Sequence, residues 1–320
     1  MAFDGITIAA MVSELNKNLS GGRINKIAQP ENDELLITGK GTNGQKRLLL
    51  SASASLPLIY FTAKNRISPL TAPNFCMLLR KHIGSARITA IRQPGLERVV
   101  EFELEHLNEL GDVCHKLLIM ELMGKHSNII FCDDNGMILD SIKHVSCNVS
   151  SVREVLPGRP YFIPHTQDKL DPLTISKEDF IEKVCGRSNA ISKALYQTLT
   201  GLSPVMAQEI CYRAQVDGND DSQSLSQAAM ERIYTEFSNI TEQIRREEFT
   251  PVIIFKDNEP VEYGVLPLFQ YGEGFTAQTF ESVSEMLETY YASRDVITRI
   301  RQKSADLRKI VQTALDRNRK

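Results

Sequence analysis

The sequence has no apolar run near the ~20 residues that a bilayer-spanning helix needs, so a membrane span is excluded. It also lacks an excess of charge of either sign, because 37 lysines and arginines face 40 aspartates and glutamates. The net charge of −3 means that any contact with nucleic acid must come from local basic patches. Residues 1–6 show no basic stretch ahead of an apolar one. We therefore expect no secretory signal and a cytoplasmic location.

Metal-site and catalytic motifs are missing as well. The six cysteines are Cys76, Cys114, Cys132, Cys147, Cys185 and Cys211, and no two have CxxC spacing. The six histidines show neither HxH nor HxxxH spacing. We expect reduced, mostly buried thiols, no metal and no other cofactor. No nucleophile elbow, Walker A or paired-acid motif is present, so we predict no catalytic residue and no enzyme activity.

The 320 residues, 42% of them hydrophobic, fit two or three globular domains. The pattern predicts an α+β fold in residues 1–175, with mostly antiparallel strands and two helices, Ile6–Asn18 and Pro73–Ile83. The pattern predicts helices in residues 176–248 and two extended stretches in residues 249–280. Residues 281–320 form one long helix with apolar a/d positions and a basic excess, which we interpret as the first helix of a truncated coiled-coil arm.

Two glycine-containing turns resemble phosphate-binding motifs. Gly39–Gly44 matches GxGxxG but precedes an apparent strand, so we interpret it as a hairpin and not as a nucleotide site. Leu199–Pro204 lies between helical stretches and resembles a helix-hairpin-helix turn. Gly201 and Ser203 there are candidate phosphate contacts, because N–H groups at the N-terminus of a helix bind anions. Ser203 and Pro204 are also good N-cap and N1 residues, so a purely structural role stays equally open.

Charged side chains follow two other turns. Arg98 ends a Pro-Gly turn and begins the apolar face of the next strand, whereas Glu97 begins its polar face. At that rim a guanidinium can extend into solvent harmlessly or be held rigid to bind a phosphate or a base, and position alone favours neither. Lys125 and His126 lie between two strands; His126 has no recognisable catalytic partner, and a hairpin loop is the commoner explanation.

Seven motifs in a fixed order resemble one family. They are Phe3–Gly5, Gly21–Ile27, Leu49–Ala52, Phe75–His82, Gly95–Arg98, Met123–Asn128 and Val155–Gly158. Together they resemble the N-terminal part of the NFACT family over essentially all 320 residues. The resemblance implies an NFACT-N domain similar to the N-domain of formamidopyrimidine-type DNA glycosylases, then a helix-hairpin-helix domain and the coiled-coil helix. Met1-Ala2-Phe3 lacks the terminal proline and adjacent acid that those glycosylases use, so we expect no glycosylase activity.

For function, the resemblance implies ribosome-associated quality control. Such proteins bind the large (50S) ribosomal subunit and its rRNA while it carries an obstructed peptidyl-tRNA. They recruit tRNA, alanyl-tRNA in bacteria, for mRNA-independent C-terminal alanine tailing, and the ribosome itself carries out the peptide transfer. The family's tRNA-engaging Asp-Arg pair matches Glu97 and Arg98, with a carboxylate one methylene longer. Further RNA-backbone contacts are expected from Arg23, Lys26, Arg80, Lys81, Lys125, His126, Gly201 and Ser203.

Two alternatives stay open at this point. A fibronectin-binding surface adhesin is suggested by an older name of the family, and the expected absence of a secretory signal argues against it. A DNA-binding or DNA-repair module is suggested by the helix-hairpin-helix turn and the glycosylase-like fold.

Overall fold

The computed structural model describes residues 3–164 and 168–292. The chain divides into two compact units, Met1–Phe249 and Thr250–Lys320. The finer division expected at residues 175 and 280 stays a prediction. No helix in the described part of the chain is long and apolar enough to cross a membrane.

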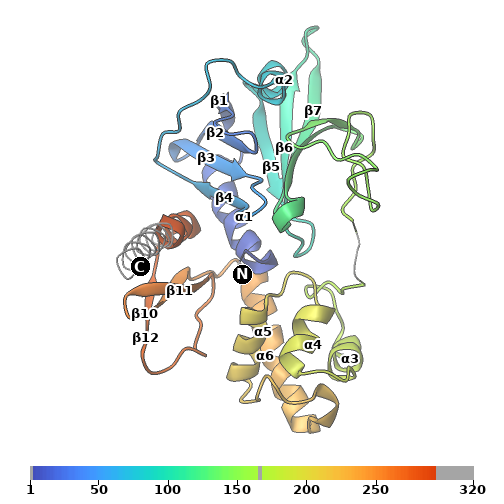
Figure 1. Cartoon of the computed structure of the whole chain (residues 1–320), viewed down its shortest axis with the longest axis vertical. Helices are drawn as coiled ribbons and strands as arrows, with labels where there is room; N and C mark the ends of the chain where they lie inside the picture. The colour runs from blue at the N-terminus through green and yellow to red at the C-terminus, as the bar shows by residue number, and fades with distance from the viewer. Residues whose placement is uncertain (1–2, 165–167, 293–320) are drawn as a thin grey trace, which may run out of the picture. The chain divides into compact units, whose positions relative to one another are not determined.

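The first unit is built on a nine-stranded sheet in which all neighbouring strands are antiparallel, in the order β4-β3-β2-β1-β5-β6-β7-β8-β9 (Figure 1). The strands are β1 (Arg23–Ala28), β2 (Glu34–Gly41), β3 (Gly44–Ser51), β4 (Leu58–Phe61), β5 (Arg87–Arg92), β6 (Val99–Leu107), β7 (Val113–Glu121), β8 (Asn128–Asp133) and β9 (Ile138–Ser141). The predicted α+β class with a mainly antiparallel sheet is confirmed. Gly41 pairs with Gly44 across the β2–β3 turn, so the GxGxxG segment is the hairpin predicted from the sequence.

Two helices pack on this sheet, α1 (Gly5–Leu19) and α2 (Asn74–Ile83). Helix α1 approaches β2 so closely that a Cβ atom on Gly41 would lie 1.8 Å from the carbonyl oxygen of Asn18. Helix α2 is tied to β1 because the Nε of Arg80 donates a hydrogen bond of 2.8 Å to the carbonyl oxygen of Ile27. A glycine of the sheet thus allows the close contact of α1, and a side-chain hydrogen bond holds α2 on the sheet.

The rest of the first unit is helical, as the pattern over 176–248 predicts. It contains α3 (Lys177–Phe180), which continues into the π-helical turn η2 (Ile181–Cys185), then α4 (Ile191–Thr198), α5 (Pro204–Arg213), the short η3 (Ser222–Ser224) and α6 (Gln227–Arg245). Each long helix buries one apolar face, and Phe180 stacks on Phe237 of α6 with ring centroids 4.6 Å apart. Residues 199–203 form the turn that joins α4 to α5.

The second unit corrects the expectation of two extended stretches. Its sheet has three strands, β10 (Val252–Lys256), β11 (Glu259–Gly264) and β12 (Phe275–Thr279), in the order β11-β10-β12. Strand β12 cannot be recognised from the sequence pattern, because it is a mostly exposed edge strand with a single large apolar side chain, Phe275. Residues 283–292 are helical, and the predicted coiled-coil seam beyond them lies outside the described residues.

Candidate nucleic-acid interface

Three segments distant in sequence meet, backbone against backbone, at the N-terminus of α1. The N–H of Gly5 donates a hydrogen bond of 3.0 Å to the carbonyl oxygen of Gly201. A Cβ atom on Gly5 would lie 2.0 Å from the carbonyl oxygen of Leu96 and 2.7 Å from the Cα of Gly201. Gly201 has φ +77°, a left-handed conformation that glycine adopts without strain. The start of α1, the 93–98 turn and the 199–203 turn therefore form one rigid junction.

The N-caps of two helices contact each other in this junction. The Oδ1 of Asp4 accepts hydrogen bonds from the N–H (2.8 Å) and the hydroxyl (2.9 Å) of Thr7, and so caps α1. The Oγ of Ser203 caps α5 by accepting from the N–H of Met206 at 3.3 Å, and it also hydrogen-bonds to Asp4. Burial raises the pKa of Asp4, and these hydrogen bonds oppose the rise. Ser203 is buried, so its hydroxyl serves the contact between the caps.

The turn that carries Glu97 and Arg98 is fixed from both sides. The Nε2 of Gln93 donates hydrogen bonds to the carbonyl oxygens of Gly5 (2.8 Å) and Glu97 (2.9 Å). The carbonyl oxygen of Arg98 accepts from the N–H of Leu122 at 2.9 Å. The side chain of Arg98 is exposed, and it forms no hydrogen bond or ion pair within the described part of the chain. A rigid backbone thus presents an unengaged guanidinium to solvent.

Lys169 lies beside this pair and was missed by the sequence analysis. Its Nζ donates a hydrogen bond of 2.8 Å to the carbonyl oxygen of Tyr196, and the side chain is partly buried. Burial lowers the pKa of Lys169, and the charge of Arg98 lowers it further, whereas Glu97 opposes the shift. No signal in the sequence links residue 169 to residue 98, because the two residues come close only in the folded chain.

The Met123–Asn128 motif separates into structural and exposed residues. Ser127 and Asn128 are buried: the Oγ of Ser127 accepts a hydrogen bond from the N–H of Met123 (2.8 Å), and the Nδ2 of Asn128 donates to the carbonyl oxygen of Lys143 (2.9 Å). Lys125 and His126 are exposed on the short 3-10 turn η1 (Gly124–His126). Because the end of β7 pairs with the start of β6, this turn is at the same end of the sheet as Arg98.

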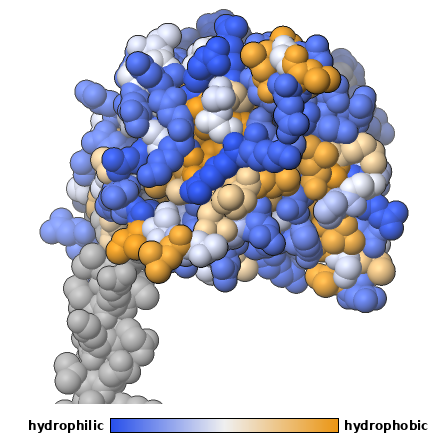
Figure 2. Space-filling view, turned by 90° about the horizontal axis from the view of Figure 1, so that it is seen from above, coloured by the Kyte–Doolittle hydropathy of each residue, from blue (hydrophilic) through white to orange (hydrophobic). Residues whose placement is uncertain are grey.

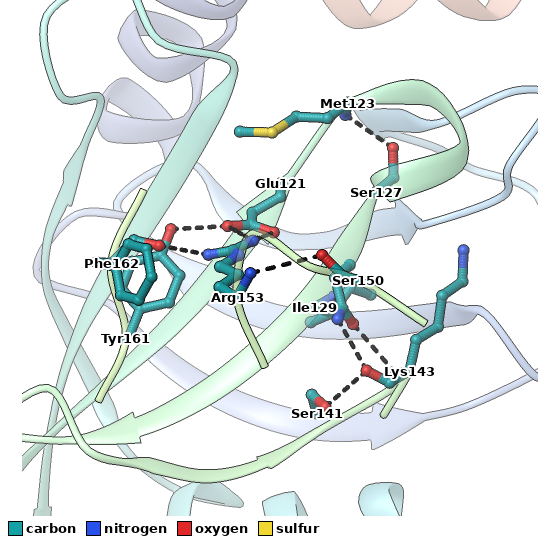
Figure 3. A network of polar contacts seen from close by, with 11 residues as sticks. Glu121, Met123, Ser127, Ile129, Ser141, Lys143, Ser150, Arg153, Tyr161 and Phe162 are labelled. Carbon is teal, nitrogen blue, oxygen red and sulfur yellow. Dashed lines mark hydrogen bonds and ion pairs between the residues drawn. The ribbon is translucent and has the colours of Figure 1, made fainter. Parts of the chain in front are cut away.

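A buried ion pair packs beside the start of β6. Glu121 pairs with Val99 across the strands; its carboxylate is fully buried and accepts a hydrogen bond of 2.6 Å from the Nη2 of Arg153. The hydroxyl of Tyr161 donates a further bond of 3.0 Å to the same carboxylate, as Figure 3 shows. This network anchors the segment after β9 onto the sheet beside Val99, the residue that follows Arg98.

The remaining candidates lie away from this junction. Arg23 begins β1, just after the C-terminal end of α1, whereas the Gly5–Gly201 junction is at the N-terminal end of the same helix. Lys81 is exposed and lies 3.9 Å from the carboxylate of the equally exposed Glu109. The structure therefore groups Glu97, Arg98, Gly201 and Ser203 at one end of α1 and places Arg23 at the other. The candidate cations Arg23 and Arg98 therefore do not belong to one surface. Within the described residues, no three metal-binding side chains come together.

The first unit is thus an α+β scaffold that presents positive charge on rigid turns, an arrangement suited to binding polyanions. Over residues 4–320 the sequence matches the family described as "NFACT N-terminal and middle domains", and the chain belongs to this family. It is 34% identical over 321 residues to "Rqc2 homolog RqcH" of Bacillus subtilis (strain 168), covering 99% of this chain and 54% of that protein. It spans about half the length of such curated relatives.

Two further comparisons extend this result. The chain is 24% identical over 217 residues to "Ribosome quality control complex subunit NEMF" of Mus musculus, covering 68% of this chain and 19% of that protein. The solved N-terminal structure of the fibronectin/fibrinogen-binding protein from Streptococcus suis matches with a TM-score of 0.75 and 33% identity. That match covers 91% of this chain and 99% of the solved chain.

Proposed function

We propose that this chain is the N-terminal part of a ribosome-associated quality control factor. It binds the large ribosomal subunit that still carries an obstructed peptidyl-tRNA. Membership of the NFACT family and its similarity to RqcH and to a ribosome quality control complex subunit support this function. The factor acts in the cytoplasm without an enzymatic step of its own, and peptide transfer takes place at the ribosome's RNA centre.

In this proposal the first unit engages tRNA, alanyl-tRNA in a bacterium, for mRNA-independent alanine tailing. The observation that carries it is the exposed, unpaired guanidinium of Arg98 beside the ammonium of Lys169. Arginine presents several N–H donors in a planar fork, which suits phosphate groups and base edges. Because the turn behind Arg98 is fixed by Gln93 and Leu122, little backbone entropy is lost when RNA binds.

Glu97 has a supporting role in this site. It is partly exposed, and its charge acts on Lys169 together with that of Arg98. A carboxylate near two cations reduces the repulsion between them in the free protein and can accept a hydrogen bond from a base or a ribose hydroxyl. The additional methylene relative to aspartate lets that acceptor reach further from the turn.

The α4–turn–α5 unit supplies a second contact as a helix-hairpin-helix element. Since the hydroxyl of Ser203 is occupied by Asp4 and Met206, the contact uses backbone N–H groups of the turn around Gly201. Lys125 and His126, exposed at the same end of the sheet as Arg98, add charge near the bound backbone. The likeness of the first domain to DNA glycosylases stays a prediction.

The test is fluorescence anisotropy with labelled alanine tRNA and a duplex DNA of similar charge, across a salt series. We expect tighter binding of tRNA, and a loss of that preference in Arg98→Ala. Arg92→Ala is the matched control, because Arg92 is an exposed arginine of the same hairpin that is already paired with Glu103 at 3.0 Å. Equal affinity of Arg98→Ala and the wild type, with folding confirmed by circular dichroism, would refute the assignment of Arg98.

Binding of fibronectin is a second candidate, favoured by the name of the solved Streptococcus suis relative. It predicts saturable binding to immobilised fibronectin and detection of the protein on intact cells. A preference for duplex DNA over tRNA at equal salt would instead favour a DNA-binding module.

A further inference from the structure

The sheet holds a row of positive charges at the end of α1 opposite to Arg98. Arg23 of β1 pairs directly with Lys40 of β2 on one side and with Arg87 of β5 on the other. Residues directly opposite each other on antiparallel strands point to the same face of the sheet. Three cationic side chains on three adjacent strands therefore stand in one row, and all three are exposed.

The two arginines occupy the closest kind of cross-strand position. The N–H of Ile24 donates to the carbonyl oxygen of Ala86 (2.9 Å), and that of Ile88 donates to the carbonyl oxygen of Gly22 (2.8 Å). These bonds flank Arg23 and Arg87 without joining them, which defines a non-hydrogen-bonded pair with a Cα separation of about 4.5 Å. Like charges in this position destabilise a sheet.

A β-bulge adds a fourth cation to the same face. Arg23 and Lys26 are three residues apart, so in a regular strand they would point to opposite faces. The register of β1 shifts between Ile24 and Lys26, so Lys26 pairs with Thr38, two residues before Lys40. Arg23 and Lys26 consequently share one face. A bulge that re-aims a charged side chain in this way is a feature of functional surfaces.

Acidic side chains balance the row only in part. Arg23, Lys26, Lys40 and Arg87 form no ion pair with any acidic side chain among the residues that the structure describes. Glu105 of β6 is the cross-strand partner of Arg87, so its carboxylate lies on the same face, although the two side chains form no ion pair; Lys40 is opposite the neutral Gln45. The guanidinium of Arg23 donates only to the carbonyl oxygen of Ser85, at 3.3 Å. The repulsion between Arg23 and Arg87 is thus offset only in part, and a bound anion would relieve the rest.

We propose that Arg23, Lys40 and Arg87, with Lys26 beside them, bind the phosphodiester backbone of RNA at a second surface, separate from the Arg98 turn. The inference rests on the proposed RNA-binding function. Cations spaced along a row match the repeating charge of a nucleic-acid backbone better than a single phosphate. Figure 2 shows one face of the molecule, which is mainly hydrophilic with separate hydrophobic patches. The Arg98 turn and the Arg23 row lie at opposite ends of helix α1. In this proposal, one RNA or two neighbouring RNA segments contact both surfaces.

The experiment compares Arg23→Gln/Arg87→Gln with the wild type in anisotropy titrations of labelled tRNA at several salt concentrations. Counterion release contributes roughly five- to eightfold per phosphate contact at 0.1 M salt, so we expect at least about a tenfold loss of affinity. The slope of log affinity against log salt should decrease by about 1.4 to 1.8. Lys183→Gln/Arg187→Gln, which removes two exposed charges from the segment before α4, should change neither quantity appreciably.

The thermal midpoint shows that any loss of affinity is not caused by misfolding. Because the variant removes a repulsive pair, its Tm in the absence of RNA should equal or exceed that of the wild type. Unchanged affinity and salt slope would overturn the second surface. So would retained tRNA binding with lost binding of labelled polyglutamate, which would identify an acidic protein partner instead. If Arg98→Ala weakens tRNA binding and this variant does not, only the present inference fails; if the wild type binds no tRNA, the proposed function fails first.

Discussion

The N–H of Gly5 donates a hydrogen bond of 3.0 Å to the carbonyl oxygen of Gly201, across almost two hundred residues of sequence. This bond joins the first turn of α1 to the turn between α4 and α5 and encloses the carbonyl group of Leu96 between them. Neither glycine can acquire a Cβ atom without displacing backbone. The position of Arg98, two residues after Leu96, therefore depends on two residues that have no side chains.

Gly201→Ala should destabilise the protein strongly. The new Cβ atom would lie 2.4 Å from the carbonyl oxygen of Leu96, and φ of +77° would add backbone strain. We expect a loss of about 2–4 kcal/mol in the free energy of unfolding, measured by urea denaturation. Gly158→Ala is the control, since Gly158 has φ +80° and open space around it. Its cost should be about 1–2 kcal/mol. Equal costs at both positions would contradict the close packing of the junction.

Asp4 should be replaceable by asparagine but not by alanine. Asn keeps an oxygen that can accept from Thr7 and cap α1, whereas Asp4→Ala removes the cap and should cost about 1 kcal/mol. The charge itself has a cost, because burial raises the pKa of Asp4 above its usual value of 3.8. The folded protein therefore holds the proton more tightly than the unfolded chain, and stability falls as pH rises from 3.8 through the folded pKa.

Asp4→Asn lacks this pH dependence. Its stability relative to the wild type should accordingly increase as pH rises through that window, in urea denaturations at matched pH values. A difference that is constant from pH 3 to pH 7 would show that the carboxyl group of Asp4 titrates normally.

The ion pair between Glu121 and Arg153 should matter for stability more than an exposed pair does. Arg153→Ala leaves the fully buried carboxylate of Glu121 without its counter-charge, so we expect a loss of about 3–5 kcal/mol. Glu121→Gln/Arg153→Met removes both charges and should recover most of that loss. Arg159→Ala breaks the more exposed pair with Glu154 and should cost about 1 kcal/mol or less. Similar losses for both arginines, by chemical denaturation, would contradict the ranking.

Local patterns predicted most of the sheet, because alternation and turn residues report on neighbours in sequence. The antiparallel character of the sheet was predicted, and the Gly41–Gly44 hairpin follows from its turn residues. The exposed edge strand β12 carries no such alternation and was not recognised. Helix α1 was predicted one residue short at each end, although Asp4 is a suitable N-cap directly before it.

The candidate sites were harder to predict from the sequence, because they depend on strand register and on packing. Arg98 could be selected from its turn and from the family resemblance, but nothing near it in sequence indicates Lys169. Arg23 and Lys26 were selected as cations without a known geometry. Their alignment with Lys40 and Arg87 follows from the bulge in β1 and from the single pair that joins β1 to β5, and neither feature has a signature in the sequence.

The cysteines should react in two distinct groups. Cys76, Cys132, Cys185 and Cys211 are buried, whereas Cys147 is exposed and Cys114 is intermediate. Burial raises the pKa of Cys132 and Cys211 to about 12 and that of Cys185 to about 11. Since the thiolate is the reactive form, these thiols are both inaccessible and almost fully protonated at pH 8.

A thiol-reactive disulfide reagent should therefore modify Cys147 quickly, Cys114 more slowly, and the four buried cysteines only when the protein is unfolded. Absorbance of the released thiol, followed with time in native buffer and in urea, gives the two groups directly. Cys147→Ser should abolish the fast phase and leave the urea-dependent phase unchanged. Rapid reaction of more than two cysteines in native buffer would mean that the core of the sheet or of the helices opens far more readily than its packing implies.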